Sequence, residues 1–330
     1  MKNPSVTIGI LIFRGEKFFD HLLASIAGQK FQDFEILVLD NEPGGDGRRA
    51  LQERLQVVWA GLAGKVKILR TPKSLSFSRG HNLLLERSRG EFYFCANQDL
   101  IFCPGCLHAL VQAMVENEKA ATCQGAIFKW DFAKGRKLPV IDSLGLRILP
   151  SFKVENVGEG LPENFQKTKS VQKILGPTGA AFLARRRIFQ EHFAGRLFDE
   201  NFPFFKEDCD LAANLTWGNF PSLLVGDAVC HHARTAGRKS FFAKSEFEKI
   251  NSNLGQSIFV AKHFHPNFPW QMRWKIFWRE FFRQLFLAVF APRIFWKVRC
   301  ALQSRRAKIA QSRRGILRRI PPKEFASRLL

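Results

Sequence analysis

Short apolar runs and segments with helical periodicity alternate over the first hundred residues of the chain. The run Val6–Phe13 is rich in β-branched and large apolar residues, which is typical of a buried strand in a parallel sheet. Residues 16–29 instead repeat their apolar side chains at helical spacing. The alternation continues with strands at Phe34–Leu39, Val66–Leu69 and Glu91–Ala96, and with helices before Val66 and at Leu83–Ser88. This order predicts an α/β fold with a mostly parallel sheet flanked by helices.

Polar side chains follow two of these predicted strands. Asp40 and Asn41 come directly after the second strand, and Asn97, Gln98 and Asp99 come directly after the fourth. The carboxyl ends of parallel strands meet at one edge of a sheet, where ligands bind. One carboxylate there can accept hydrogen bonds from a base or ribose, and another can hold a divalent cation against a diphosphate. The same residue types also cap turns, so the pattern leaves both a nucleotide-sugar site and a structural role open.

Positive charge is concentrated near the C-terminus. The formal net charge is +22, and residues 261–330 hold 17 lysines and arginines against two acidic residues, Glu280 and Glu324. Four of the seven tryptophans lie in the same stretch. The proline-broken segment His263–Pro269 marks the shift in composition. We therefore expect a domain at residues 1–262, followed by a basic, aromatic-rich helical tail at residues 263–330.

The first part of this tail predicts an amphipathic helix that Pro292 should stop or kink. Its apolar positions recur at helical spacing and are Trp274, Phe277, Trp278, Phe281, Leu285, Ala288 and Val289. A basic helix with such a face is typical of a membrane interface, although the same face could pack on the main domain. Nucleic acid would also match the charge. We favour an anionic membrane surface as the partner of residues 270–330, and we do not expect nucleic acid.

Composition narrows the classes of protein to which the chain could belong. Hydrophobic residues make up 46% and charged residues 24%, which excludes a disordered or collagen-like chain. Seven cysteines without framework spacing favour a reducing compartment, and we expect neither a secretory signal nor a spanning helix. P-loop, G-x-S-x-G and G-x-G-x-x-G patterns are missing, and with them the usual signatures of NTPases, hydrolases and dinucleotide-binding enzymes.

Five ordered segments over about residues 5–265 resemble glycosyltransferase family 2, which has the GT-A fold, in its bacterial rhamnosyltransferase-like branch. The first runs from the opening strand to LVLDNEPGGDG, and the second, SLSFSRGHN to FYFCANQDL, resembles the approach to the D-x-D-type motif. GPTGAAFLARRRIF resembles the acceptor-side strand, and FFKEDCDLAANL resembles the segment that supplies the base. VCHH resembles the strand that carries a histidine near the metal or diphosphate.

The resemblance implies a role for individual residues. It implies that Asp208 is the catalytic base, with Glu207 beside it, and that Asp99 binds metal and diphosphate together with His231 or His232. We select His231 as the metal ligand. The residues expected to bind the nucleotide-sugar are Asp40, Asn41, Arg79, Asn82, Asn97 and Asp99.

The resemblance also has departures, because Asn97 replaces the first acid of the metal motif and Ser74, Ser76 and Arg79 replace the usual residues of the loop before Asn82. We therefore expect Mg²⁺ or Mn²⁺ as cofactor without strict dependence.

Together these features predict an inverting glycosyltransferase. The expected donor is a UDP- or dTDP-type nucleoside diphosphate-sugar carrying a hexose or deoxyhexose. The expected acceptor is a lipid-linked saccharide or a cell-envelope glycan, and the expected location is cytoplasmic, peripheral on the inner face of the membrane. Two alternatives stay open: a catalytically weak binding protein that acts as an assembly partner, and a nucleic-acid-binding protein that uses the basic tail.

Overall fold

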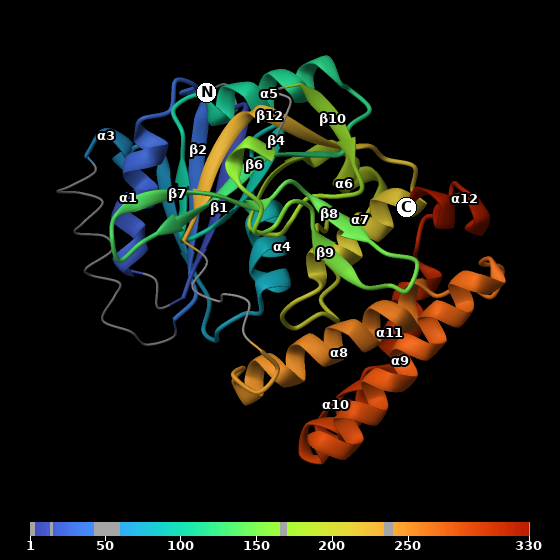
Figure 1. Cartoon of the computed structure of the whole chain (residues 1–330). Helices are drawn as coiled ribbons and strands as arrows, with labels where there is room; N and C mark the ends of the chain where they lie inside the picture. The colour runs from blue at the N-terminus through green and yellow to red at the C-terminus, as the bar shows by residue number, and fades with distance from the viewer. Residues whose placement is uncertain (1–3, 14–15, 43–59, 166–169, 234–239, 330) are drawn as a thin grey trace.

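A single mixed sheet with helices on both faces forms the larger part of the molecule (Figure 1). The computed structural model describes residues 4–13, 16–42, 60–165, 170–233 and 240–329. The main strand order is β10-β12-β6-β11-β4-β1-β2-β3, with β5 paired to β12 and β7 paired to β6. The strands are β1 (Val6–Ile12), β2 (Phe34–Asp40), β3 (Val66–Arg70), β4 (Phe92–Asn97), β5 (Leu100–Phe102), β6 (Thr122–Asp131), β7 (Arg136–Ser143), β10 (Val171–Ile174), β11 (Ala181–Arg185) and β12 (Ser222–His232). A separate hairpin joins β8 (Leu146–Ile148) to β9 (Val154–Asn156).

The helices fall into two groups along the chain. Those among the strands are α1 (Glu16–Ala27), α3 (Ala60–Ala63), α4 (Phe77–Arg87), α5 (Cys106–Glu116), the 3-10 turn η1 (Glu163–Phe165), α6 (Arg186–His192) and α7 (Glu207–Trp217). Those after the sheet are α8 (Glu246–His263), α9 (Trp270–Phe290), α10 (Pro292–Ser304), α11 (Arg306–Arg314) and α12 (Pro322–Arg328). Figure 1 shows α8 to α11 grouped on one side of the sheet, away from the N-terminus.

The predicted α/β architecture is confirmed. Strands β3, β2, β1 and β4 are parallel neighbours, and the apolar side chains of β1, β2 and β4 join those of α1 and α5 in the central core. Helix α4 begins six residues earlier than the sequence pattern predicted, at Phe77, because the Ser76 hydroxyl accepts a hydrogen bond from the Arg79 N–H and caps the helix. The glycine-rich turn at residues 43–47 lies outside the described residues.

The close approach of Gly9 and Tyr93 in the core explains why position 9 is glycine. The Tyr93 hydroxyl lies 2.9 Å from Nδ1 of the buried His81. A side chain at Gly9 would place its Cβ 2.1 Å from that hydroxyl oxygen, so the strand β1 needs glycine there. Burial lowers the pKa of His81 to about 3, so this histidine is a neutral core residue.

The C-terminal helices share a hydrophobic cluster with the sheet domain. Phe325 of α12 stacks on Trp217 of α7 at 3.9 Å between ring centroids, and the Arg319 N–H donates to the Trp217 carbonyl. The cluster also contains Phe152 and Phe202 from the sheet domain and Ile276 from α9. The segment His263–Pro269, where we expect the boundary, joins the end of α8 to the start of α9, and the hydrophobic cluster continues across it.

The predicted amphipathic helix is present as α9. It ends at Phe290, and Pro292 opens α10 at a position where its missing N–H costs nothing. Among the helices that the structure describes, none combines the length and the apolar character needed to cross a bilayer.

Candidate functional site

Strand register brings the predicted acidic residues to one edge of the sheet. Ile12 of β1 pairs with Asp40 of β2, and Leu11 pairs with Asn97 of β4, so the two polar strand ends flank the end of β1. The Gln98 side chain ties the end of β4 to the end of β1, because its amide exchanges hydrogen bonds with the Phe13 backbone at 2.9 and 3.1 Å. The edge where a parallel sheet binds its ligand is therefore built as the sequence predicted.

Asp40 is held in place by a residue that the sequence reasoning did not single out. Arg70, which lies opposite Asp40 in the register of β2 and β3, donates to its Oδ2 at 2.5 Å. The Asp40 side chain keeps 12% of its surface exposed. Its other oxygen accepts from the Glu42 N–H at 3.3 Å. Arg70 thus fixes the carboxylate at the strand end and balances its charge.

The histidine beside Asp99 is His232, which corrects the choice of His231. His232 Nε2 lies 3.1 Å from Asp99 Oδ1 and 3.4 Å from the Asn97 amide nitrogen. His231, the neighbour on the strand, points to the other face, where its ring packs against Trp130 and lies 3.8 Å from the Cys103 sulfur. Adjacent strand residues face opposite ways, so only one of the two can meet Asp99.

A buried carboxylate sets the orientation of His232. Asp142 of β7 is fully buried and lies 2.9 Å from His232 Nδ1. Burial alone would lower the pKa of His232, but the charge of Asp99 and the hydrogen bond to Asp142 outweigh it and raise the pKa to about 9. Sequence reasoning missed Asp142, and its one signal was an acid inside the apolar run Val-Ile-Asp-Ser-Leu.

These side chains have the chemistry of a small cation site. With its raised pKa, His232 carries a proton on both nitrogens when it pairs with Asp142 and Asp99. Its Nε2, which also faces Asn97, could ligate a metal only after releasing that proton, and Asp142 would then orient the ring. Over the described residues no group of three or more His, Cys, Asp or Glu side chains is arranged to hold a metal ion. The donor set is thus one imidazole, one carboxylate and one amide, which fits a divalent cation that takes its other ligands from a diphosphate.

Asp208 and Glu207 open helix α7 beside the same edge. The Gly179 N–H donates to Asp208 Oδ2 at 3.1 Å, and the adjacent Ala180 carbonyl accepts from the Asn97 N–H at 2.9 Å. The segment 179–180 therefore bridges the predicted base and the end of β4. Acidic residues in the first turn of α7 also complement the helix dipole.

The two neighbouring carboxyl groups differ in environment. Glu207 Oε2 is buried and has no hydrogen-bond partner among the described residues. Burial, followed by the charge of Asp208, raises the pKa of Glu207 to about 8. Asp208 instead accepts hydrogen bonds through both oxygens, from Gly179 and from the Cys209 N–H at 2.8 Å. The pair therefore places a carboxyl group with a raised pKa next to one whose two oxygens both accept hydrogen bonds.

The turn before α7 is held in an unusual conformation. Phe205 and Lys206 have φ angles of 65° and 73°, in the left-handed region that side chains disfavour. Helix α8 braces this turn through Gly255, where an added Cβ would meet the Phe205 carbonyl oxygen at 2.7 Å. The turn aims the first residues of α7, so α8 contributes to the placement of Asp208.

Three predicted ligand residues are engaged in holding loops. The Asn41 amide exchanges hydrogen bonds with the Leu75 backbone at 2.7 and 2.9 Å. The Asn82 amide oxygen accepts from the Leu197 and Phe198 N–H groups. Arg79 pairs with Glu200 at 3.2 Å, and Arg79 and Asn82 line a separate hollow of about 450 Å³. The structure thus gives Asn41 and Asn82 positioning contacts and sets Arg79 and Asn82 in a hollow that Asp99 and Asp208 do not line.

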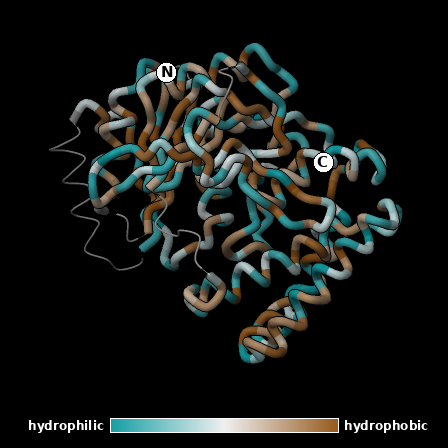
Figure 2. Tube along the Cα trace, in the orientation of Figure 1, coloured by the Kyte–Doolittle hydropathy of each residue, from teal (hydrophilic) through white to brown (hydrophobic). Residues whose placement is uncertain are grey.

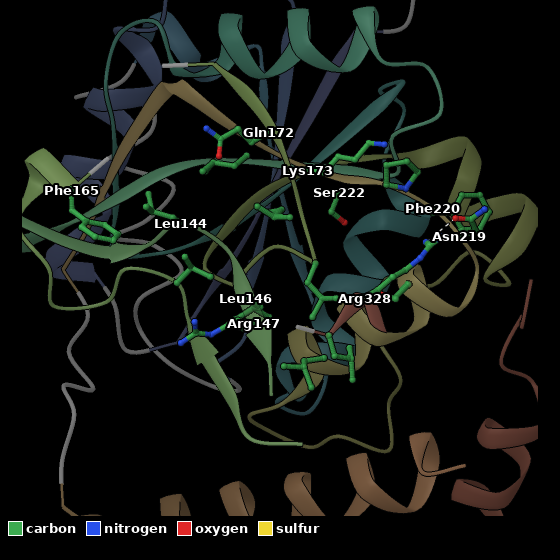
Figure 3. Close-up of a pocket in the computed structure, with 18 residues that line it drawn as sticks. Leu144, Leu146, Arg147, Phe165, Gln172, Lys173, Asn219, Phe220, Ser222 and Arg328 are labelled. Atoms are coloured by element: carbon green, nitrogen blue, oxygen red, sulfur yellow. Dashed lines mark hydrogen bonds between the residues drawn. The ribbon is translucent and has the colours of Figure 1, made fainter. Parts of the chain in front are cut away.

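A cavity of about 950 Å³ lies elsewhere, between the β8 hairpin, β10 and α12 (Figure 3). Its walls are mainly apolar, with Leu144 and Leu146 on one side. Two of its cationic side chains already have partners, since Arg147 pairs with Glu155 and Arg328 donates to Asn219. None of the predicted site residues lines this cavity.

Comparisons with solved structures show a similar fold. The fold resembles that of GalNAc-T7 with UDP, GalNAc and Mn²⁺, with a TM-score of 0.61, 13% identity and coverage of 79% of this chain. The chain spans about half (48%) of that protein's length. It also resembles a mannosyltransferase from Pyrobaculum calidifontis in complex with GDP-Man and Mn²⁺, with a TM-score of 0.51 and 14% identity, over 94% of this chain and 79% of the other.

At these identities the likeness establishes the fold alone. No curated protein sequence matches the chain. The family model described as glycosyl transferase family 2 matches residues 7–193, which is more than half of the chain. The chain therefore belongs to glycosyl transferase family 2.

Proposed function

We propose that this protein transfers a sugar from a nucleoside diphosphate-sugar to a saccharide acceptor, with inversion and with Asp208 as the base. The observation that carries the proposal is the short bridge of Gly179 and Ala180, which ties the Asp208 carboxylate to the end of β4. That end also carries Asn97 and Asp99 beside His232. The proposed base and the proposed diphosphate site are therefore linked through one short segment.

Each residue has a stated part in the transfer. Asp40, fixed by Arg70, accepts hydrogen bonds from the nucleotide base or ribose. Asp208 takes the proton of the acceptor hydroxyl as that oxygen bonds to the anomeric carbon and the nucleoside diphosphate leaves from the opposite face. Glu207, with its raised pKa, keeps a proton near neutral pH and adds no second negative charge beside the base.

Asp99, Asn97 and His232 would hold a divalent cation, Mg²⁺ or Mn²⁺, which when bound neutralises the charge of the leaving diphosphate. Asp142 keeps the His232 ring turned toward Asp99. Asn97 supplies an amide in place of a carboxylate, so we expect a weakly held ion. Both similar structures described above contain Mn²⁺, which supports a cation in this site.

The finer features of the reaction are also proposals. We infer a UDP- or dTDP-type donor with a hexose or deoxyhexose, in line with the rhamnosyltransferase-like branch. We infer an acceptor that is a lipid-linked saccharide or an envelope glycan, met at the inner face of the membrane. The basic, aromatic C-terminal helices support this peripheral location.

The test is the substitution Asp208→Asn, with Asp227→Asn as the matched control. Asp227 is an exposed acid on β12. Loss of a general base should reduce the transfer rate about 10²- to 10⁴-fold while donor binding, followed by thermal shift with a panel of nucleotide-sugars, stays intact. Transfer that survives in Asp208→Asn would refute the base assignment.

A second candidate function is favoured by Asn97, which weakens the cation site. In it the protein binds nucleotide-sugar or glycan and acts as an assembly partner without turnover. Donor binding by the unaltered chain without transfer or donor hydrolysis, at any Mg²⁺ or Mn²⁺ concentration, would favour this alternative.

A further inference from the structure

Helix α9 exposes a continuous aromatic face. Six large side chains on it are each 43% to 65% exposed, and we call them the aromatic face: Trp270, Trp274, Phe277, Trp278, Phe281 and Phe282. At ~100° per residue they fall within an arc of ~140°, and Leu285 and Val289 continue the same arc toward the end of the helix. Isolated apolar residues on a surface are ordinary, but a contiguous face of this kind marks an interaction site.

None of the other residues that the structure describes covers this face, because α9 packs through its opposite side. Met272, Ile276 and Leu287 are buried in the cluster shared with the sheet domain. Glu280 and Arg283 lie on the same inner side, where Arg283 reaches Ser257 of α8 at 2.9 Å. Figure 1 shows α9 and α10 lying along the outer edge of the molecule, and Figure 2 shows hydrophobic residues recurring along these helices.

The exposed apolar surface extends beyond α9. Trp296 on α10 is 64% exposed, and Phe290 at the end of α9 is 63% exposed. On the other side, Phe242, which is 69% exposed, packs edge-on against Phe286. Phe242 thus adds an aromatic side chain beside α9 through its contact with Phe286, and α10 carries a further exposed aromatic side chain in Trp296.

Positive charge surrounds these aromatic side chains. Arg273 and Lys275 are exposed and flank the aromatic face on either side of the helix, and Arg293 and Arg299 are exposed on α10. Glu280 is the one acidic residue between 270 and 300, and Arg279 and Arg283 neutralise it on the inner side. The chemistry is therefore aromatic and cationic together.

We propose that the aromatic face and the exposed basic residues of α9 and α10 lie in the interface of an anionic lipid bilayer. Tryptophan and phenylalanine enter the region between headgroups and acyl chains, while arginine and lysine reach lipid phosphates along their flexible stems.

The proposed surface is smaller than residues 270–330. Beyond α10, several arginines serve the fold: Arg313 donates to the Ala261 and Phe264 carbonyls, and Arg328 donates to Asn219. This inference rests on the peripheral location given above for the glycosyltransferase, but not on the transfer chemistry.

The experiment is flotation of the full chain with vesicles of phosphatidylcholine alone and with added phosphatidylglycerol. One variant combines Trp274→Ser, Trp278→Ser and Phe281→Ser, all at exposed positions. The matched control combines Val115→Ser, Leu161→Ser and Phe165→Ser, which are exposed apolar residues of the sheet domain. We expect the affinity for anionic vesicles to fall about 100-fold or more in the first variant and to stay unchanged in the control. The unaltered chain should bind neutral vesicles at least about tenfold more weakly than anionic ones.

Three results would overturn the proposal. The first is unchanged flotation of the aromatic variant, and the second is a dimer of the unaltered chain in light scattering that the same variant dissociates. The third is the absence of flotation together with binding to RNA or DNA that falls steeply with salt. Thermal shift with nucleotide-sugars on the same samples reports donor binding separately, so failure of the surface and failure of the proposed function give different results.

Discussion

Replacing Lys262 by methionine should expose how strongly the C-terminal helices are joined to the domain. Lys262 is 3% exposed and lies 2.7 Å from Asp210 and 2.8 Å from Asp199. The neighbouring His263 approaches the other oxygen of Asp210 at 2.7 Å. Burial alone would raise the pKa of Asp210, but the charge of Lys262 and the hydrogen bond with His263 lower it. Asp210 is therefore a buried anion whose stability depends on these partners.

Removing one member of a buried ion pair leaves the other charge uncompensated, at a cost of about 3–5 kcal/mol. With an unfolding entropy of about 2.1 cal/mol/K per residue, that loss lowers the melting temperature by about 4–7 °C in a chain of 330 residues. Urea unfolding followed by circular dichroism measures the free energy directly. Lys173→Met, at an exposed position on β10, is the matched control and should change it little.

The double variant Lys262→Met with Asp210→Asn decides the mechanism. It removes the orphaned charge together with its partner, so it should be less destabilised than the two single losses added together. In Lys262→Met alone the deficit should shrink as the pH falls, because a protonated Asp210 no longer needs a cation. Strict additivity within about 0.5 kcal/mol, or a deficit independent of pH, would refute this account of the cluster.

Three further predictions address the site. The folded chain keeps a proton on Glu207 up to about pH 8, whereas the unfolded chain releases it near pH 4.5. The free energy of unfolding should therefore fall as the pH rises between these values. In urea titrations, Glu207→Gln should flatten this pH dependence. Gly255→Ala should push α8 off the Phe205–Lys206 turn, costing about 1–3 kcal/mol and lowering the turnover rate more than the donor affinity; an unchanged rate would contradict the bracing role. His232→Ala should abolish the response of donor binding to Mn²⁺ whereas His231→Ala should retain it, and the reverse result would restore His231 as the ligand.

The sheet could be predicted because the local sequence of each strand already shows the apolar pattern of a buried strand. Val6–Ile12 and Phe34–Asp40 are apolar on both faces, as parallel strands between two layers of helices must be. Polar residues directly after such strands must lie at the ligand edge, so Asp40, Asn97 and Asp99 could be placed from order alone. These inferences need only local pattern and the rule that parallel strands end at one side.

The choice between His231 and His232 could not be made in the same way. Side chains alternate along a strand, so the two histidines must face opposite sides of the sheet, but this rule does not say which of them faces Asp99. The pairing of β12 with β6 also shifts register between Val225 and Val229. The deciding partner, Asp142, is 90 residues away in sequence. The local sequence around it does not predict which strand it pairs with. The role of Arg70 could not be predicted for a similar reason, since it depends on the register between β2 and β3.

The amphipathic pattern of α9 was found, but the pattern could not say which face is buried. The wider aromatic arc is exposed, while the narrower set of Met272, Ile276 and Leu287 packs inward. Periodicity measures only where apolar residues lie around a helix, and a helix with two apolar sides can offer one to the fold and keep the other for a partner. The buried side is instead set by contacts with residues far away in the chain, such as the hydrogen bond of Arg283 to Ser257 of α8.

The same packing decides how membrane binding must be tested. A chain shortened at Lys262 would lose His263 from the Asp210 cluster and Phe325 from its stack on Trp217, so it would expose a hydrophobic core as well as remove the aromatic face. Weaker flotation, or new aggregation on vesicles, would then report unfolding as much as lost lipid contact. Substitutions confined to exposed side chains of α9 leave this core intact. Only they separate the support that α8 gives to the turn before Asp208 from the bilayer contact that we propose for α9.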